Sequence, residues 1–122
     1  VIMRLHLFDS ELRLMELVWA KAPVSARELS LLAAEALDWN KNTTYTVLKK
    51  LVEKGYVQRE EPNFICTPLI EKKQLARDEK DSLISKLYGG SKKAFFAALL
   101  EEEQLSQGEL QELRALIDGY EK

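Results

Sequence analysis

Residues 40–57, NKNTTYTVLKKLVEKGYV, open with short polar side chains and become apolar only from Val47. Asn40 is one of the residue types that cap helix N-termini, and Gly55 is the type that most often ends a helix. Between them, apolar residues such as Val47 and Leu51 recur at helical spacing. The stretch therefore predicts a helix that begins after Asn40, ends just before Gly55 and buries one face.

The two faces of this predicted helix differ in chemistry. On a helical wheel the inner side holds Thr44 together with the aliphatic residues. The first turns of the helix contain no acidic residue. The outer side carries Asn42, Thr43, Thr46, Lys49, Lys50 and Glu53. Its hydroxyl, amide and ammonium groups suit phosphates and the acceptor-rich major groove of DNA. We interpret the outer side as a DNA-binding surface; from this helix alone, a simply solvated face is the alternative.

Two shorter helices are predicted before this one. Asp9 can cap a first helix that ends near Lys21, ahead of Pro23. Ser25 and Glu28 have the spacing of a capping box, which predicts the start of a second helix.

A β-hairpin is predicted after the third helix. Residues 56–60 and 64–67 are β-prone, and Pro62-Asn63 between them is a turn signal. Three short helices followed by a hairpin form a winged helix-turn-helix, with the third helix in the recognition position. The expected fold is mainly α with a small β-hairpin (α+β), and Arg59 is the basic residue expected to act in the wing.

Residues 69–122 are predicted to form three helices that follow a winged-helix DNA-binding domain of residues 1–68. Gly89-Gly90 breaks the helical pattern, Ser106 and Glu109 have the spacing of a second capping box, and the final helix has an apolar stripe of Leu110, Leu113, Ile117 and Tyr120. The segment from Ala94 to Leu100 is apolar nearly all round. Three such helices cannot bury this surface alone, so we expect a second copy of the chain to cover it; a ligand pocket is the alternative. The interface residues expected in this homodimer are Leu87, Phe95, Phe96, Leu99, Leu100, Leu113 and Ile117.

Composition and charge limit the possible function classes. The 122 residues, 46% of them hydrophobic, suit one ordinary domain or a small domain with an appendage. No apolar run approaches the roughly 18 residues of a membrane span, and the start, Val1 to Leu7, is too short for a signal peptide. With a single cysteine and no targeting segment, we expect a cytoplasmic protein that has no membrane partner.

The charge is unevenly distributed. A net charge of −2 argues against indiscriminate binding to nucleic acid. Residues 39–59, however, contain five basic residues and Glu53 as their single acid, a local excess of +4. One basic segment in an otherwise neutral to acidic chain indicates a localised contact with nucleic acid.

The sequence offers little to an enzyme or a metal site. His6 is its only histidine and Cys66 its only cysteine, and no glycine-rich loop is present to hold a phosphate. These residues supply neither a nucleophile–base pair nor three or four clustered metal ligands. We expect no catalytic residue, no cofactor and no metal, with Cys66 as a small core residue of the hairpin.

The motifs DSELRLMELVW (residues 9–19), NKNTTYTVLKKLVEKGYV and CTP (residues 66–68) resemble the penicillinase-repressor family, the BlaI/MecI/CopY group of bacterial winged-helix repressors. The resemblance extends to the C-terminal helices and implies a homodimer that sits on a palindromic operator and blocks transcription of resistance or stress genes. The positions that match the family's DNA-contacting helix surface are Asn42, Thr43, Tyr45, Thr46, Lys49 and Lys50. Tyr45 lies at the edge of that surface, within reach of a sugar-phosphate or a base methyl group.

The chain departs from the family pattern in three places. The wing tip reads Glu60-Glu61-Pro62-Asn63, where family wings carry basic residues and a glycine. The cysteine-rich tail of copper-responsive members is absent. Family members that respond to β-lactams are cut at an Asn–Phe bond by a regulatory protease, so the resemblance implies a regulatory protease as a possible partner. The corresponding residues of this chain are Ala98-Leu99.

A winged-helix module that binds protein, without reading a DNA sequence, is the competing interpretation of the whole chain. The acidic wing tip and the negative net charge favour it, whereas the basic segment and the family motifs favour DNA. Salt-dependent binding to duplex DNA separates the two, because neutralisation of phosphates gives a steep salt dependence.

Overall fold

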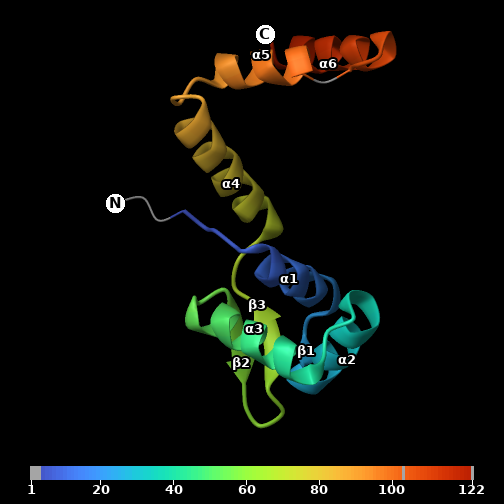
Figure 1. The fold of residues 1–122 in the computed structure, drawn as a ribbon, viewed down its shortest axis with the longest axis vertical. Coiled ribbons are helices and arrows are strands. Elements are labelled where there is room, and N and C mark those ends of the chain that lie inside the picture. Colours follow the sequence, from blue (N-terminus) through green and yellow to red (C-terminus); the bar gives the residue numbers. More distant parts are fainter. Residues whose placement is uncertain (1–3, 103, 122) are drawn as a thin grey trace. The chain divides into compact units, whose positions relative to one another are not determined.

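The computed structural model describes residues 4–102 and 104–121, so that residues 1–3 of the N-terminal stretch lie outside it (Figure 1). The elements in chain order are α1 (Asp9–Lys21), β1 (Val24–Ser25), α2 (Ala26–Leu37), α3 (Lys41–Glu53), β2 (Val57–Glu60), β3 (Ile65–Pro68), α4 (Lys72–Leu87), α5 (Lys92–Glu102) and α6 (Gln107–Tyr120). They form two compact units, of which the first extends to Lys80 and the second begins at Asp81. The expected α+β fold, helices with a small sheet, is confirmed.

The helices of the first unit begin and end where local chemistry favours it. The side chain of Ser25 accepts a hydrogen bond from the backbone N–H of Glu28 (3.1 Å), and that of Asn40 accepts one from Thr43 (2.8 Å). Gly55 follows α3 with a φ of +78°, a left-handed conformation that only glycine adopts without strain. The predicted starts of α2 and α3, and the predicted end of α3, are confirmed.

The predicted cap of α1 is wrong by one residue. Phe8 is the N-cap, and Asp9 is already the first residue of the helix. The backbone N–H of Phe8 donates to the carboxylate of Glu11 (2.9 Å), so this amide is satisfied by a side chain of the first turn of the helix. Asp9 is therefore not needed as a cap.

The inner face of α3 packs on α1 and α2, as the helical wheel predicts. Thr44, Val47, Leu48 and Leu51 are all buried. The Thr44 hydroxyl donates to the carbonyl oxygen of Asn40 (3.3 Å), which satisfies this polar group within the core. The residues of α1 and α2 that are fully buried in the same cluster are Leu14, Met15, Val18, Leu29 and Ala33.

A three-stranded antiparallel sheet, in the order β1-β3-β2, completes the first unit. The hairpin of β2 and β3 is the predicted one, but β1 was not predicted, because two residues are too few to show an alternating pattern. Val24 of β1 lies opposite Cys66 of β3, and Cys66 is fully buried, which confirms it as a core residue. Burial raises the pKa of the Cys66 thiol, opposed by the charge of Arg59, and so keeps the sulfur protonated.

The first turns of α4 belong to the same unit. The indole Nε1 of Trp19 donates to the carbonyl oxygen of Ile70 (2.9 Å), and Leu75 is buried in the shared core. On the surface, Lys72 pairs with Glu16 of α1 (2.9 Å). The segment that leaves the wing is thus held against α1.

The second unit consists of the rest of α4 together with α5 and α6. Gly89 and Gly90 separate α4 from α5 with φ values of +56° and +81°, as the sequence predicts. Ser106 begins α6 with the predicted capping box, since its side chain accepts from the N–H of Glu109 (3.1 Å). Within the described residues, every helix is too short or too polar to cross a membrane.

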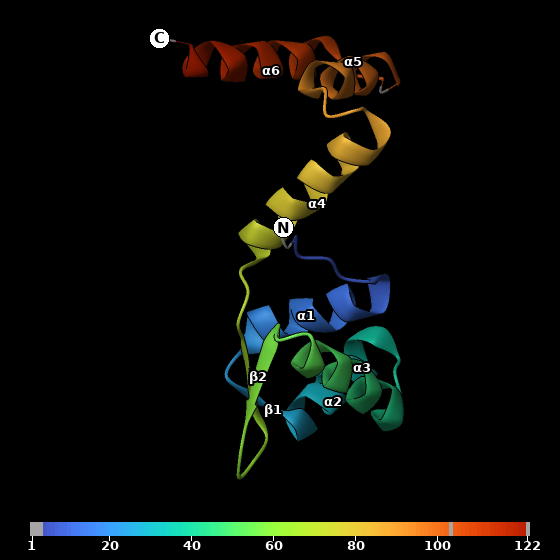
Figure 2. The same ribbon diagram turned by 90° about the vertical axis from the view of Figure 1, so that its left-hand side faces the viewer.

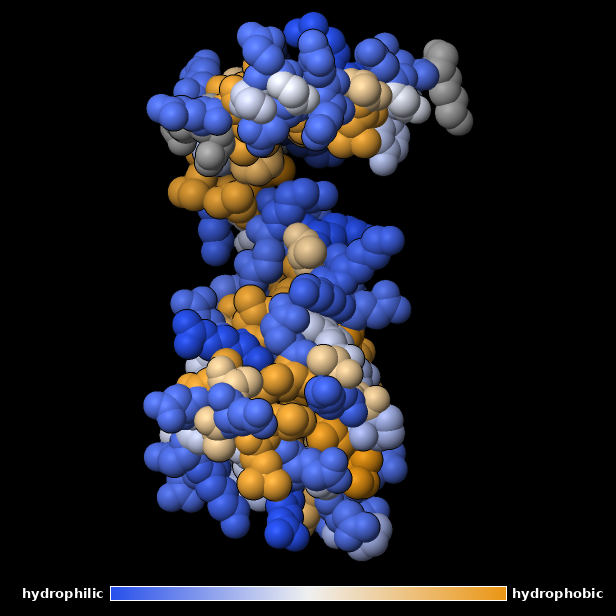
Figure 3. Space-filling view, turned by 90° about the vertical axis from the view of Figure 1, so that its right-hand side faces the viewer, coloured by the Kyte–Doolittle hydropathy of each residue, from blue (hydrophilic) through white to orange (hydrophobic). Residues whose placement is uncertain are grey.

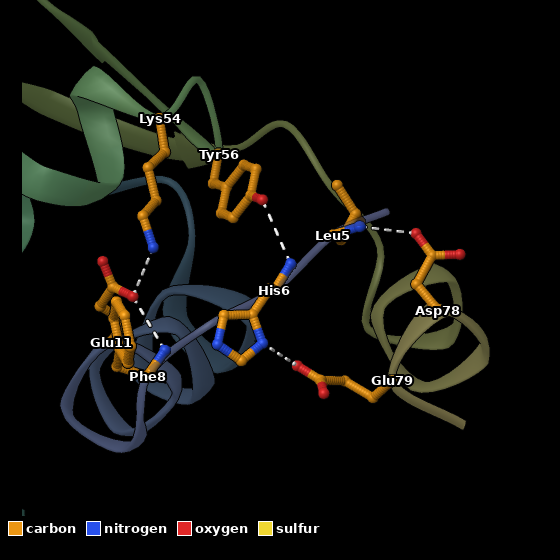
Figure 4. Close-up of polar contacts among 8 residues, drawn as sticks. All are labelled: Leu5, His6, Phe8, Glu11, Lys54, Tyr56, Asp78 and Glu79. Atoms are coloured by element: carbon orange, nitrogen blue, oxygen red, sulfur yellow. Dashed lines mark hydrogen bonds and ion pairs between the residues drawn. The ribbon is translucent and has the colours of Figure 1, made fainter. Parts of the chain in front are cut away.

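A polar network holds the C-terminal end of α3 (Figure 4). Lys54, which follows α3, donates to Oε1 of Glu11 at 2.7 Å, and its ammonium group lies 4.9 Å from the ring centre of Phe8 and 5.9 Å from that of Tyr56. The Tyr56 hydroxyl in turn accepts from the backbone N–H of His6 (3.3 Å). These contacts fix the end of α3 to α1 and to the N-terminal segment.

Glu11 is the buried charge in this network, only 1% exposed. Its burial alone would raise the pKa of the carboxyl, but hydrogen bonds from Lys54 and the Phe8 N–H, with the charges of Lys54 and Lys50, lower it below the ordinary value. The second carboxylate oxygen is buried and has no hydrogen-bond partner among the described residues. The pairing with Lys54 is therefore what compensates for burying this charge.

We predict that Glu11→Gln weakens the acid dependence of stability. Because the carboxyl has a lower pKa in the folded than in the unfolded chain, its contribution is fully present above about pH 4.5, the ordinary value, and is lost as the pH falls through the folded-state pKa. The variant should be roughly 1–3 kcal/mol less stable at pH 7 and should lose less stability on acidification. Denaturant unfolding at several pH values measures both effects.

Glu16→Gln is the matched control. Glu16 also pairs with a lysine, but its side chain is 45% exposed, and exposed pairs contribute little. Equal losses of stability in the two variants would contradict the role assigned to the Glu11–Lys54 pair.

Candidate nucleic-acid interface

The outer face of α3 carries exposed hydrogen-bond donors, with the carboxylate of Glu53 at its C-terminal end. Five of the six residues predicted on this helix are exposed on the side opposite to the core, namely Asn42, Thr43, Thr46, Lys49 and Lys50. The first turn of the helix contains no acidic residue. In Figures 1 and 2, α3 lies beside α2 and below α1, which hold its inner side. At the C-terminal end of this exposed side, Lys50 lies near the start of α1, where it lines a shallow pocket with Ser10 and Glu11.

Tyr45 differs from the other five. It is half-buried and packs against the edge of the core, and the ammonium group of Lys41 lies 5.6 Å from its ring centre. Its position at the edge of the outer face agrees with the sequence analysis.

The basic charge available on this surface is smaller than the sequence suggests. Lys54 contributes to the +4 excess of residues 39–59, but it is committed to Glu11 and the two aromatic rings. The positive charges that remain on α3 are those of Lys41, Lys49 and Lys50. The sequence shows the lysines, but it does not show that Lys54 pairs with the buried Glu11.

The wing carries charges of opposite sign on its two faces. Arg59 and Glu60 are both exposed on β2, and adjacent residues of a strand point to opposite sides of the sheet. Gln58 donates to the carboxylate of Glu60 (2.7 Å), on the same side, whereas the guanidinium of Arg59 lies 5.3 Å from the ring centre of Phe64. Phe64 did not enter the predicted site, because nothing in its local sequence indicates a partner across the hairpin.

The second unit presents an apolar groove between α5 and α6. The cavity measures about 200 Å³ and is lined by Phe96, Leu99, Leu100, Leu113, Leu116, Ile117 and Tyr120. Five of the seven residues expected in a dimer interface are among them. Of the other two, Leu87 is 71% exposed and Phe95 packs edge-to-face on Tyr88, with 5.5 Å between ring centres.

Leu116 and Tyr120 were not among the expected interface residues, although they line the groove. Tyr120 lies in the predicted apolar stripe of the last helix, and Leu116 directly precedes Ile117 of that stripe. The groove is therefore wider than the expected dimer interface. Figure 3 shows hydrophobic side chains on the surface of this helical unit. Its largely exposed apolar residues include Phe96 at 52% and Ile117 at 54%.

The residues that the structure describes bring no three histidine, cysteine or carboxylate side chains together as a metal site. Cys66 is buried, and His6 instead contacts Glu79 of α4 through Nδ1 at 3.2 Å. The histidine and the cysteine therefore lie in separate contacts and do not form a shared metal site.

Comparison with known proteins identifies relatives over nearly the whole chain. The family model described as penicillinase repressor matches residues 7–119. The methicillin resistance regulatory protein MecI of Mammaliicoccus sciuri is 28% identical over 112 residues, which cover 90% of this chain and 91% of that protein. The penicillinase repressor of Bacillus licheniformis is 25% identical over 114 residues, covering 92% of this chain and 89% of the relative.

A solved structure shares the fold. The solution structure of the DNA-binding domain of the repressor BlaI superposes with a TM-score of 0.53 at 24% identity, covering 59% of this chain and 93% of that domain. The winged-helix prediction is thereby confirmed. The chain belongs to the penicillinase repressor family, whose members are DNA-binding transcriptional repressors and not enzymes.

Proposed function

We propose that this chain binds an inverted-repeat operator as a homodimer and represses resistance or stress genes until an inducing signal releases it. The observation that carries the proposal is the outer face of α3, where five exposed donor side chains stand opposite a fully packed inner face. The proposed partners are double-stranded operator DNA and a second copy of the chain.

The side chains of α3 divide by the chemistry of their targets. Lys49 and Lys50 are assigned to phosphates or a guanine edge, because an ammonium group neutralises phosphate and donates to guanine acceptors. Asn42, Thr43 and Thr46 are assigned to base edges and the nearby backbone. Tyr45 lies at the rim of this surface, and Arg59 contacts DNA from the wing.

Dimerisation is assigned to residues 69–122. The α5–α6 groove exposes large apolar side chains, which favours a second protein surface over water. Interfaces of permanent dimers bury more than about 2,000 Å² and resemble a core cut in half. A two-fold dimer presents two copies of α3, so its operator should be an inverted repeat.

We predict different effects for two substitutions on α3. Thr46→Ala removes a base contact and should weaken the cognate site by roughly 1–3 kcal/mol per contact while relaxing selectivity. Lys50→Ala removes a phosphate contact, so it should weaken binding to all sequences alike and reduce the salt slope by about 1 per subunit. Lys73→Ala, an exposed lysine of α4, is the control of equal charge change. Titrations at several salt concentrations measure these effects, and α3 variants that bind like the control would refute the assignment.

We predict that footprinting on DNA selected from a random pool protects two half-sites centred about 10 bp, or a multiple of that, apart. The protection should weaken steeply with salt. A module that binds only protein would protect no palindrome and would show no salt-dependent affinity for any duplex.

We predict that Phe96→Glu produces monomers, because a charge in the apolar groove cannot be buried against a second copy. Leu31→Glu is the matched control, since Leu31 is 61% exposed on α2 of the other unit. Sedimentation at micromolar concentration should give a dimer for the parent and the control. A parent protein that sediments as a stable monomer would exclude the homodimer.

A further inference from the structure

Phe64, at the end of the wing loop, has an unusual backbone for its side chain. Its φ is +52°, in the left-handed region that bulky side chains rarely adopt. Its side chain is nevertheless 44% exposed, so burial of the ring does not account for this conformation. A strained backbone that holds an aromatic ring toward solvent suggests that the ring has a role there.

The strain is maintained by hydrogen bonds on the inner side of the residue. The carbonyl oxygen of Phe64 accepts from the backbone N–H of Ala26 (3.0 Å) and from the thiol of Cys66 (3.4 Å). Ala26 is the first residue of α2, and Cys66 lies in the buried part of β3. The main chain of Phe64 is therefore anchored to the helix-turn-helix while its side chain is directed outward.

The outward ring supports the guanidinium of Arg59, 5.3 Å from the ring centre. Arginine stacks well on aromatic faces because its cation is planar and weakly hydrated. A carboxylate could also hold Arg59 in place, but it would cancel the charge. An aromatic ring restricts the side chain and leaves the charge available for phosphate.

The hairpin separates this cation from the carboxylate of Glu60. In the β2–β3 register Arg59 lies opposite Cys66, and Glu60 lies opposite Ile65. Arg59 shares its strand face with Val57, which is 1% exposed against the core, whereas Glu60 shares the other face with Gln58. The basic side of the wing is thus continuous with the side of the sheet on which the helices pack.

We propose that Phe64 is a positioning residue for DNA binding, whose ring presents Arg59 to the phosphate backbone flanking the groove that α3 occupies. The inference rests on the proposed function and adds a residue to it. Phe64 acts through Arg59, so removing the ring should matter only while the guanidinium is present.

The test uses Phe64→Asn, Phe64→Tyr, Arg59→Gln and the double variant Phe64→Asn/Arg59→Gln, in the full chain. Asparagine tolerates the left-handed backbone but has no ring, and tyrosine keeps the ring. The probe is a duplex selected from a random pool by the parent protein. Thermal unfolding identifies any variant whose fold is damaged.

We expect Phe64→Asn to weaken binding about two- to five-fold per wing, in line with an exposed cation–π contact, without a matching loss of thermal stability. Phe64→Tyr should bind like the parent. Arg59→Gln should weaken binding and lower the salt slope by about 1 per subunit. Adding Phe64→Asn to Arg59→Gln should cause no further loss of affinity.

Three results would overturn the inference: Phe64→Asn binding like the parent, Phe64→Tyr losing as much affinity as Phe64→Asn, or fully additive effects of the two substitutions. Lys50→Ala separates this failure from that of the proposed function. If Lys50→Ala weakens binding and the wing variants do not, the roles of Phe64 and Arg59 are wrong while the assignment of α3 stands. If the parent shows no salt-dependent DNA binding, the proposed function fails and this inference with it.

Discussion

The burial of the inner face of α3 is the constraint on which the other features depend. Each fully buried aliphatic side chain on that face, such as Leu48 or Leu51, contributes roughly 1.5–3 kcal/mol, which fixes the rotation of the helix about its axis. That rotation decides which side chains point outward, so the donor surface is a consequence of core packing. Asn40 fixes the start of the helix and Lys54 its end, and together they keep the outer residues in one register.

The electrostatics of the surface are set by pairings as much as by composition. Lys54 is neutralised by a buried carboxylate, and Glu60 is turned to the side of the wing opposite Arg59. The result is a small number of positive groups on α3 and the wing, in a chain whose net charge is −2. Such a distribution favours selective over indiscriminate binding, because only a defined geometry of phosphates meets these charges.

Features that depend on neighbouring residues were predictable, and features that depend on tertiary contacts were not. The caps Ser25, Asn40 and Ser106 and the breaks at Gly55 and Gly89 follow from local chemistry and were predicted from sequence. Strand β1 requires β3, and the burial of Glu11 requires Lys54, and both partners are distant in the chain. The Arg59–Phe64 contact joins residues that are close in sequence, but it forms only across the folded hairpin. In the candidate sites, periodicity predicted which side of each helix is exposed. It did not predict that Lys54 pairs with Glu11 or that Leu116 lines the α5–α6 groove.

Methylation interference tests the central claim, that the outer face of α3 enters the major groove, most directly. Guanine N7 lies in the major groove and adenine N3 in the minor groove, so the two methylated positions report on different faces of the duplex. The account predicts that methylation of guanine N7 within each half-site blocks binding, and that Thr46→Ala changes which guanines matter. Interference confined to adenine N3, or none at any guanine of the half-sites, would contradict the assignment of α3 to the groove.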